Sequence, residues 1–449
     1  MPVDIDLRNT PPARWLDVSS STEQVKEVVQ FLHQQGTFRF PVLANGLFPA
    51  AAATGDDFEA SGYHNIWVRD NVQIAYAHFR IGDVNVAIRC VNALANYFLN
   101  HRFRFEKVIT READHADAMC RPHIRFDGNS LTELTEKWAH AQNDAIGYFL
   151  WVYGLLVANA NISSEETEWD LIATIVHYLQ AICYWQDEDS GHWEETRKIS
   201  ASSIGAVKEG LNEWINVLEK SQPDSVKKLL SANHPVTLDL LKDLRNHGET
   251  ALAEILPSEC TQQDPKKFRR FDAALVFLCY PLNAVDRKTK DLILDDVAEN
   301  LTGDFGIRRY QGDSYWCANY KDLLSANQRS SDFSDDLSGR DQLLQPGTEA
   351  QWCIFDPAIS CAYGERYAND FFKGRGLSKL ALQKQIHHLQ RSLSQLTNHQ
   401  HPGGAFLCPE SYFLNRVQWI PNDLTPLLWT QANLIQALWW LEHNLALKP

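Results

Sequence analysis

The 449-residue sequence contains no run of Lys and Arg long enough to follow a phosphate backbone, and its 57 acidic residues outnumber its 42 basic ones, which gives a formal net charge of −15. It therefore offers no basic surface of the kind that follows a phosphate backbone, and nucleic acids and anionic membranes are poor candidate partners. A membrane-spanning helix needs about 18 consecutive apolar residues, and no apolar stretch in this sequence is nearly that long. No Gly-rich phosphate loop follows a strand-like segment, which argues against a nucleotide-binding enzyme. The composition favours a neutral or cationic ligand.

Paired cysteines and secretory features are also missing. The nine cysteines are odd in number and scattered, and no two of them form a Cys-x-x-Cys motif, so we expect reduced thiols in the core. Residues 1–17 are polar and lack the apolar centre of a secretory signal, so we expect a cytoplasmic protein. Aromatic residues are abundant, with 14 Trp, 14 Tyr and 21 Phe against two Met. Such rings either fill a core or stack on sugar rings and bases.

The apolar periodicity is almost entirely helical, with apolar residues repeating every three or four positions. These stripes predict helices over residues 22–35, 71–81, 84–98, 141–158, 169–184, 204–218, 225–247, 271–280, 292–301, 351–371, 377–396 and 426–445. Asp423 or Thr425 is the expected cap of the last helix, with Pro426 in its first turn. Strand-like alternation is scarce, so we expect an all-α protein. About a dozen helices would form a single domain over residues 21–449, after an N-terminal arm, 1–20.

Two polar stretches interrupt the helical pattern. Residues 221–270 are charged and contain four prolines, and they predict a helical hairpin followed by a loop. Residues 321–347 are rich in Ser and Asp and end at a Pro-Gly pair, and they predict a long surface loop or lid. Loops longer than about 15 residues are either functional or disordered.

Two segments at expected helix starts combine aromatic, basic and acidic residues. In the first, residues 63–70, Arg69 and Asp70 place a fork of donors beside a carboxylate, which suits adjacent hydroxyls of a polyol. The second, residues 138–144, reads Trp-Ala-His-Ala-Gln-Asn-Asp. For both segments the simpler interpretation is a helix-capping cluster, because Asp and Asn are common at helix starts.

Two further segments contain carboxylates beside aromatic residues. Residues 184–195 hold five carboxylates around a Ser-Gly turn, and Trp193 directly precedes Glu194. An aromatic wall raises the pKa of a carboxyl group and keeps it protonated as a general acid, although an acidic run is as often a solvated loop. Residues 402–412 contain Glu410 as their only carboxylate, and a lone Glu in an apolar loop needs a partner or a purpose. Two carboxylates from distant parts of a chain fit glycoside hydrolysis by paired acids.

Four segments, taken in order, also resemble one known family. They are Trp-Val-Arg-Asp at 67–70, the segment at 138–144, Ser-Gly-His-Trp-Glu-Glu with Ala-Ser-Ser-Ile-Gly within 189–205, and Pro-Glu-Ser-Tyr at 409–412 followed by Pro-Leu-Leu-Trp at 426–429. This combination resembles the glucoamylase family, glycoside hydrolase family 15, over about residues 63–441. The Ala-Ser-Ser-Ile-Gly and Pro-Glu-Ser-Tyr segments look most like the branch that contains the phosphorylase kinase regulatory subunits.

The resemblance implies an (α/α)6 toroid of about twelve helices in paired hairpins, in agreement with the helices counted above. It implies that Glu194 is the general acid and Glu410 the general base, and that Arg69 and Asp70 hold the terminal sugar. The further substrate-binding residues that it implies are Trp67, Trp138, Gln142, Asp144, Trp193, Glu195, Arg309 and Trp352.

The resulting hypothesis is an exo-acting, inverting glycoside hydrolase that releases glucose from an α-glucoside or a short α-glucan, without a cofactor. The alternative is a non-catalytic glucan-binding or regulatory protein of the phosphorylase kinase subunit type. Such a protein would keep the toroid and the sugar contacts. A metal site is not expected, because residues 114–123 contain His, Asp and Cys at short spacing but no zinc-like pairing.

Overall fold

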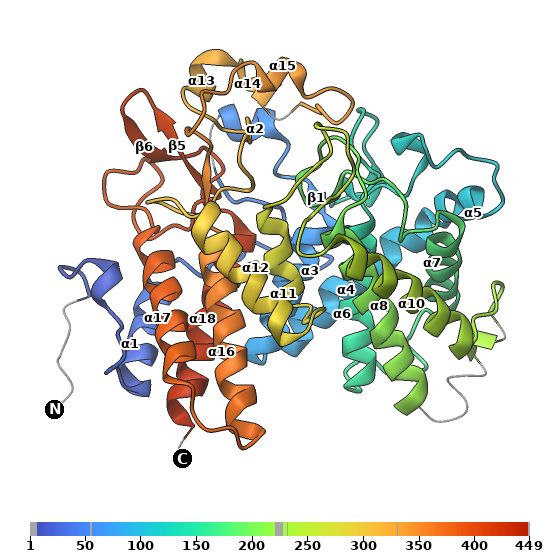
Figure 1. Ribbon diagram of the computed structural model, residues 1–449, viewed down its shortest axis with the longest axis horizontal. Coiled ribbons are helices and arrows are strands. Elements are labelled where there is room, and N and C mark those ends of the chain that lie inside the picture. The colour runs from blue at the N-terminus through green and yellow to red at the C-terminus, as the bar shows by residue number, and fades with distance from the viewer. Residues whose placement is uncertain (1–6, 54–55, 221–227, 231, 330, 448–449) are drawn as a thin grey trace.

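Six helices form a closed inner ring in the computed structural model (Figure 1). The structure describes residues 7–53, 56–220, 228–230, 232–329 and 331–447. In ring order the inner helices are α3 (Val68–Ile81), α6 (Asn143–Ala158), α8 (Ala201–Lys220), α11 (Val276–Cys279), α16 (Phe355–Phe372) and α18 (Leu428–Ala446). Each packs against the next, and α18 packs back against α3, which closes the ring.

A second set of helices surrounds the inner ring. They are α1 (Thr22–Gln35) against α18, α4 (Val84–Asn100) against α3, α10 (Leu238–Ile255) against α8, α12 (Arg287–Asn300) against α11, α17 (Lys379–Ser394) against α16, and α7 (Trp169–Ala181), which lies beside α4 and α5 (Arg102–Ile109). Leaving aside the shorter helices, outer and inner helices alternate along the chain from α1 to α18. The described residues therefore form an (α/α)6 toroid, and the predicted fold class is confirmed.

The two layers differ in how much of each helix is buried. The outer helix α1 buries one stripe of four apolar residues, whereas thirteen of the 16 residues of the inner helix α6 are buried. The inner helices α6 and α8 approach closely at Gly147, where a Cβ atom would lie 2.4 Å from the backbone nitrogen of Val207. A hydrophobic ring of this kind needs small residues where its helices cross.

Two three-stranded antiparallel sheets lie at the end of the ring where inner helices begin. They are formed by β1 (Ile66–Trp67), β2 (Arg125–Asp127) and β3 (Thr132–Glu133), and by β4 (Gln351–Trp352), β5 (Ser411–Asn415) and β6 (Gln418–Pro421). Trp67 pairs with Arg125, and Trp352 pairs with Ser411. Because β1 runs directly into α3 and β4 lies shortly before α16, the sheets fix the side chains at the starts of both helices.

The polar segment 321–347 is partly helical. It contains most of α13 (Tyr320–Leu323), α14 (Ala326–Arg329) and α15 (Ser338–Asp341), and α14 packs against α2 (Asp56–Ser61) at one end of the molecule (Figure 1). In the charged segment 221–270 the described helical residues are 228–230 and α10. The predicted helix 225–247 is wrong at residues 232–237, which are not helical, and its residues 225–227 and 231 lie outside the described part of the chain.

Ten of the twelve predicted helices are confirmed to within about five residues at each end. The predicted helix 271–280 is shorter, because it consists of the 3-10 turn η4 (Ala273–Leu275) followed by one turn, α11. The predicted cap of the last helix, Asp423 or Thr425, is wrong: α18 begins at Leu428. The backbone N–H groups of residues 427 and 428 donate to carbonyl oxygens of distant segments, which keeps the chain extended up to that point.

Residues 7–20 of the N-terminal arm pack on the toroid through Trp15. The arm contains η1 (Pro12–Arg14), and Trp15 is buried against Phe31 and Phe406. Seven of the nine cysteines are buried and all nine are free thiols, as expected of core cysteines. Within the described ranges, none of the helices has the length and apolar character needed to cross a bilayer.

Candidate active site

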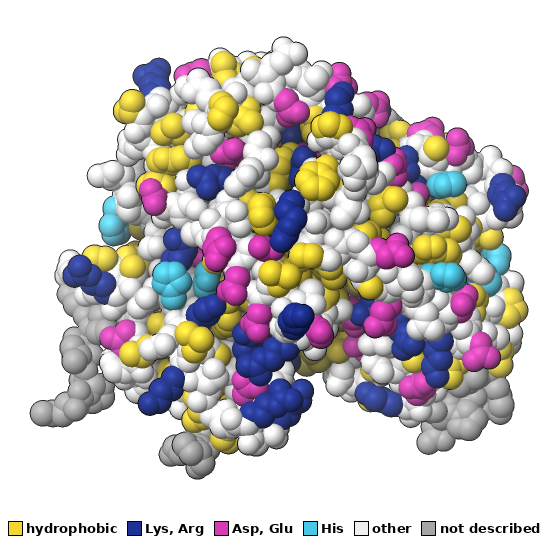
Figure 2. Space-filling view, in the orientation of Figure 1, with side chains coloured by type: hydrophobic (Ala, Val, Ile, Leu, Met, Phe, Trp, Pro, Cys, Tyr) yellow, Lys and Arg dark blue, Asp and Glu magenta, His cyan; other side chains and the backbone are white. Residues whose placement is uncertain are grey.

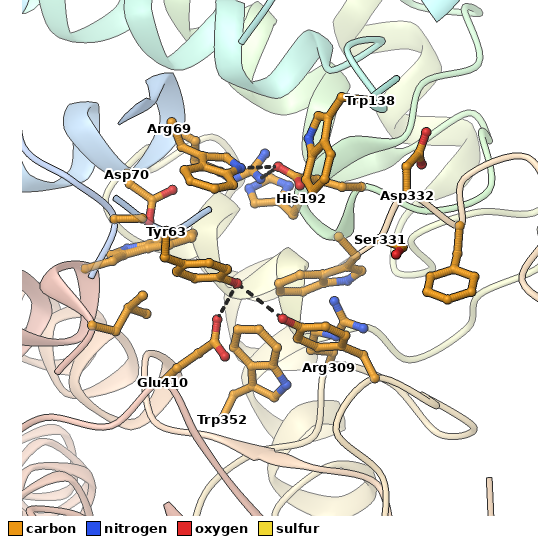
Figure 3. Close-up of a pocket in the computed structure, with 18 of the residues that line it drawn as sticks. Tyr63, Arg69, Asp70, Trp138, His192, Arg309, Ser331, Asp332, Trp352 and Glu410 are labelled. Carbon is orange, nitrogen blue, oxygen red and sulfur yellow. Dashed lines mark hydrogen bonds and ion pairs between the residues drawn. The ribbon is translucent and has the colours of Figure 1, made fainter. Parts of the chain in front are cut away.

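A cavity of about 100 Å³ lies where the inner helices begin (Figure 3). Its lining comes from segments that are far apart in the sequence, and it includes nine of the twelve predicted site residues. These nine are Trp67, Arg69, Asp70, Trp138, Trp193, Glu194, Arg309, Trp352 and Glu410. The structure thus brings most of the predicted site together around one hollow.

Two tryptophans form one wall of the cavity. Trp67 ends β1 and is the N-cap residue of α3. The guanidinium of Arg125 lies 4.9 Å from the centre of the Trp67 ring and 4.0 Å from that of Trp138. This cation–π contact joins the two rings and limits their movement.

Glu194 projects from the end of a 3-10 turn, η3 (Gly191–Trp193), and has a left-handed backbone with a φ of 57°. Non-glycine residues seldom adopt this conformation, and functional sites are among the places where they do. The Trp67 Nε1–H donates to Glu194 Oε1 over 2.9 Å, and Arg69 Nη2 lies 3.2 Å from the same oxygen. Burial raises the pKa of Glu194, while the charge of Arg69 opposes that rise.

The guanidinium of Arg69 is shared between two carboxylates. Its Nη1 donates to Asp144 Oδ2 over 2.6 Å and to Gln142 Oε1 over 3.0 Å, while its Nη2 pairs with Glu194. His192 Nδ1 lies 3.5 Å from Asp144, but burial lowers the pKa of His192 to about 4. His192 is therefore neutral near pH 7, and Arg69 is the charged partner of Asp144.

Glu410 lies across the cavity, directly before β5 (Figure 3). Its backbone oxygen accepts a hydrogen bond from the Cys353 N–H over 2.9 Å, which ties it to the end of β4. The Tyr63 hydroxyl donates to Oε1 over 2.8 Å, and the Asn422 side-chain amide donates to Oε2. Burial raises the pKa of Glu410 to about 7, and these two neutral donors oppose the rise.

Asp70, in the first turn of α3, supplies a third buried carboxyl group. Burial raises its pKa to about 7, Arg69 opposes this rise, and the negative charge of Glu194 adds to it. A carboxylate in the first turn also complements the helix dipole, so the capping interpretation and a position in the site are compatible.

The opposite wall is built around Glu195, which is almost completely buried. Its Oε1 accepts from Arg309 Nη2 over 2.7 Å and from Arg340, and its Oε2 accepts from the Tyr310 hydroxyl over 2.5 Å. Burial alone would raise the pKa of Glu195, but the two arginines outweigh it and hold the pKa near about 2. Arg309 also forms a bidentate pair with Asp313 at 2.6 Å.

Three predicted site residues, Gln142, Asp144 and Glu195, lie behind the lining rather than in it. Each one binds an arginine that does line the cavity: the first two hold Arg69, and the third holds Arg309. Their position points to an indirect role, because they orient the charged groups that face the hollow.

Comparison with known proteins gives the family. The chain matches the family model of glycosyl hydrolases family 15 over residues 26–345, which is more than half of its length. The chain belongs to glycosyl hydrolase family 15. It is thus a glycoside hydrolase, as its motifs predicted. No curated protein sequence matches it.

Solved structures share the fold of this glycoside hydrolase at low sequence identity. A wild-type glycosidase is 19% identical with a TM-score of 0.62, and the match covers 95% of this chain and 99% of that one. The glucoamylase from Saccharomycopsis fibuligera is 13% identical with a TM-score of 0.57, covering 98% and 100%. A bacterial glucoamylase complexed with acarbose is 13% identical with a TM-score of 0.53, covering 89% and 52%. These likenesses show the fold alone.

Several lining residues of this family 15 enzyme lie outside the predicted set. Tyr63 opens the segment 63–70 and Trp429 ends the Pro-Leu-Leu-Trp segment, so a search for aromatic residues within the chosen segments would have found them. Tyr315 and Arg340 had no such signal. Arg340 comes from the polar segment 321–347, where no periodicity indicated a buried side chain.

The segment 114–123 serves the site in another way. Arg121 is fully buried and forms a bidentate pair with Asp187, at 2.7 and 2.8 Å, in the loop that leads to η3. His123 stacks on His140 with ring centres 3.7 Å apart. In the part of the chain that the structure describes, no group of three or more His, Cys, Asp or Glu residues is arranged to hold a metal ion.

Proposed function

We propose that this glycoside hydrolase is an exo-acting, inverting enzyme that releases glucose from an α-glucoside or a short α-glucan, with Glu194 as general acid and Glu410 as general base. The observation that carries the proposal is the pair itself. Two carboxyl groups with raised pKa values, Glu410 buried and Glu194 partly buried, come from segments more than 200 residues apart and face one cavity whose walls are aromatic. Paired carboxyl groups in such a setting are the machinery of glycoside hydrolysis.

Glu194 suits the acid because its surroundings favour the protonated form. Burial raises its pKa, so that it keeps a proton at a pH where an exposed Glu has lost it. Trp67 and Arg69 both donate to Oε1, which leaves the acidic proton on Oε2. That proton passes to the glycosidic oxygen as the bond to the anomeric carbon breaks, so the sugar leaves as a neutral alcohol.

Glu410 suits the base because its partners favour the ionised form without a cation. The hydrogen bonds from Tyr63 and Asn422 stabilise the carboxylate and fix its plane. A water held by this carboxylate loses a proton to it and attacks the anomeric carbon on the face opposite Glu194. The product then has the inverted configuration, and inverting enzymes leave room for that water by keeping their carboxyl groups about 6.5–9.5 Å apart.

We infer the exo action from the burial of Arg69 and Asp70 in the cavity lining. Arg69 and Asp70 are buried at the first turn of α3 and offer a fork of donors beside a carboxylate. We infer that they bind hydroxyls of the non-reducing terminal glucose, with the ring against Trp67 and Trp138. A chain that enters such a site must enter by its end. A glycosidase variant of similar fold has been solved in complex with glucose.

The test is incubation with maltose, isomaltose, trehalose, maltotetraose and glycogen, with the anomer of released glucose followed by NMR. We expect release of β-glucose from at least one α-linked substrate. If the attacked anomeric carbon gives the α anomer, after subtraction of the leaving-group glucose (α in trehalose, an anomeric mixture in maltose and isomaltose), retention replaces inversion. Binding of these sugars without release of glucose from any of them would favour the non-catalytic glucan-binding alternative.

A further inference from the structure

The polar segment reaches into the site. Ser331, Asp332 and Phe333, from the connection between α14 and α15, line the cavity. Figure 3 shows Ser331 and Asp332 on the side of the hollow away from Asp70. In the proposed reaction the terminal glucose lies toward Asp70, so these residues lie on the side of the leaving group.

Residues 331–341, here called the lid segment, are anchored at two places. Near one end, Arg340 pairs with Glu195 and donates to Ser314 Oγ over 2.9 Å, and its guanidinium lies 5.5 Å from the Phe333 ring. In the middle, Asp335 forms an exposed ion pair with Lys137, next to the wall residue Trp138. The lid segment therefore spans the distance between the two walls of the cavity.

Asp332 carries a hydrogen-bond acceptor without a donor. Its Oδ1 accepts from the Ser334 N–H over 2.8 Å, which shapes the turn. Its Oδ2 is buried, and among the described residues no donor reaches it. An unsatisfied buried carboxylate oxygen is costly, and a hydroxyl group entering the cavity would satisfy it.

We propose that Asp332 and Phe333 form the binding site for the leaving-group sugar and restrict this enzyme to short α-glucosides. This inference rests on the proposed function. Asp332 accepts a hydrogen bond from a hydroxyl of the sugar next to the scissile bond. Phe333, held against Arg340, closes the hollow beyond that sugar, so a longer chain finds no room unless the lid segment moves. The leaving group that fits is a single sugar unit.

The first measurement compares kcat/KM of the whole protein for maltose and isomaltose with that for their tetrasaccharides, because specificity is a ratio of these constants. We expect the tetrasaccharide value to be at least about tenfold lower for whichever linkage is cleaved. Equal kcat/KM values for the disaccharide and the tetrasaccharide would show that the enzyme is not restricted to short α-glucosides.

The second measurement uses lid variants. Asp332→Ala should lower kcat/KM for the cleaved disaccharide by about tenfold, the effect of one lost hydrogen bond to a charged group. It should leave 4-nitrophenyl α-glucoside within about twofold, because that leaving group has no hydroxyl for Asp332 to accept from. Phe333→Ala should raise the tetrasaccharide-to-disaccharide ratio by about threefold or more. Asp322→Ala is the matched control, since Asp322 is exposed, lies in the same polar segment and is outside the cavity lining.

The outcomes separate the two proposals. If no α-glucoside is cleaved, the proposed function fails. If disaccharides are cleaved but Asp332→Ala slows the aryl glucoside as much as the disaccharide, or Phe333→Ala leaves the ratio unchanged, the lid proposal fails and the hydrolase stands. Misfolding is excluded as the cause of a loss if a variant has the same thermal unfolding temperature as the wild-type protein and keeps its activity on the aryl glucoside.

Discussion

The Tyr63 hydroxyl donates a 2.8 Å hydrogen bond to Oε1 of Glu410, although 347 residues separate the two in sequence. Tyr63 lies shortly before β1 and Glu410 directly before β5, so this contact joins the two sheets at the mouth of the toroid. Tyr315 lies 3.3 Å from the same hydroxyl. Because a hydrogen bond to the ionised form lowers a carboxyl pKa, Tyr63 influences the pH at which Glu410 would ionise to act as the proposed base.

Tyr63→Phe should therefore move the acidic limb of the kcat/KM profile. Glu410 must be ionised to accept a proton from water, so activity rises as the pH passes its pKa of about 7. Loss of the donor raises that pKa, and the limb should move to higher pH by about one unit. Tyr97→Phe is the control, since it removes a buried hydroxyl for which the described residues supply no partner. If the acidic limb of the profile does not move, Glu410 is not the general base.

Glu194→Gln should lower kcat for glycosides with sugar leaving groups by about 10²- to 10⁴-fold, because an amide can donate a hydrogen bond but cannot release a proton. Binding of the same sugars should change little. Glucosyl fluoride, whose leaving group needs no strong acid, should be cleaved with a much smaller loss. Glu254→Gln, an exposed change on α10, is the matched control. If the variant keeps wild-type turnover of disaccharides, the acid is another group.

The features that the sequence predicted correctly are those that depend on local patterns of residues. Amphipathic periodicity identified the helices of the toroid, and the motif segments supplied Arg69, Asp70, Glu194 and Glu410. Residue type and sequence neighbours are enough in these cases, because a helix start or an aromatic neighbour has the same physical effect wherever it occurs.

The sequence could not predict which side chains meet across the ring. The ion pair between Arg340 and Glu195 joins residues 145 positions apart. Glu195, which was predicted to contact the sugar, is buried and holds the lid segment in place through this pair. The polar segment 321–347 has no apolar stripe, so neither its short helices nor its place in the cavity follows from periodicity. These features depend on tertiary packing, which a single sequence does not display.

Gly147→Ala should destabilise the toroid. A Cβ atom there would lie 2.4 Å from the backbone nitrogen of Val207 in α8, and a backbone atom cannot move aside as a flexible side chain does. We expect a loss of about 1–3 kcal/mol in the free energy of unfolding, measured by denaturant titration. Gly339→Ala is the control: no atom lies within 4 Å of its added Cβ, and the change should be neutral or slightly stabilising. Equal stability of the two variants would contradict close packing of α6 on α8.

Asp144→Asn should act on the acid without touching the substrate. In the wild-type protein Arg69 divides its charge between Asp144 and Glu194. With Asp144 neutral, its negative charge no longer offsets that of Arg69 at Glu194, so the pKa of Glu194 falls. Glu194 must be protonated to act, so activity is lost as the pH rises through that pKa, and the basic limb of the kcat/KM profile should move to lower pH.

A structural role alone would not move this limb, and a matched variant separates the two cases. Asp356→Asn also neutralises a fully buried aspartate paired with an arginine, here Arg391, outside the cavity lining. Both variants should lose stability, because each leaves a guanidinium short of its charge partner: about 3 kcal/mol for Asp144→Asn, where Arg69 is buried, and less for Asp356→Asn, where Arg391 is partly exposed. Only Asp144→Asn should shift the basic limb. A shift in both, or in neither, would mean that Asp144 supports the fold without setting the charge on Glu194.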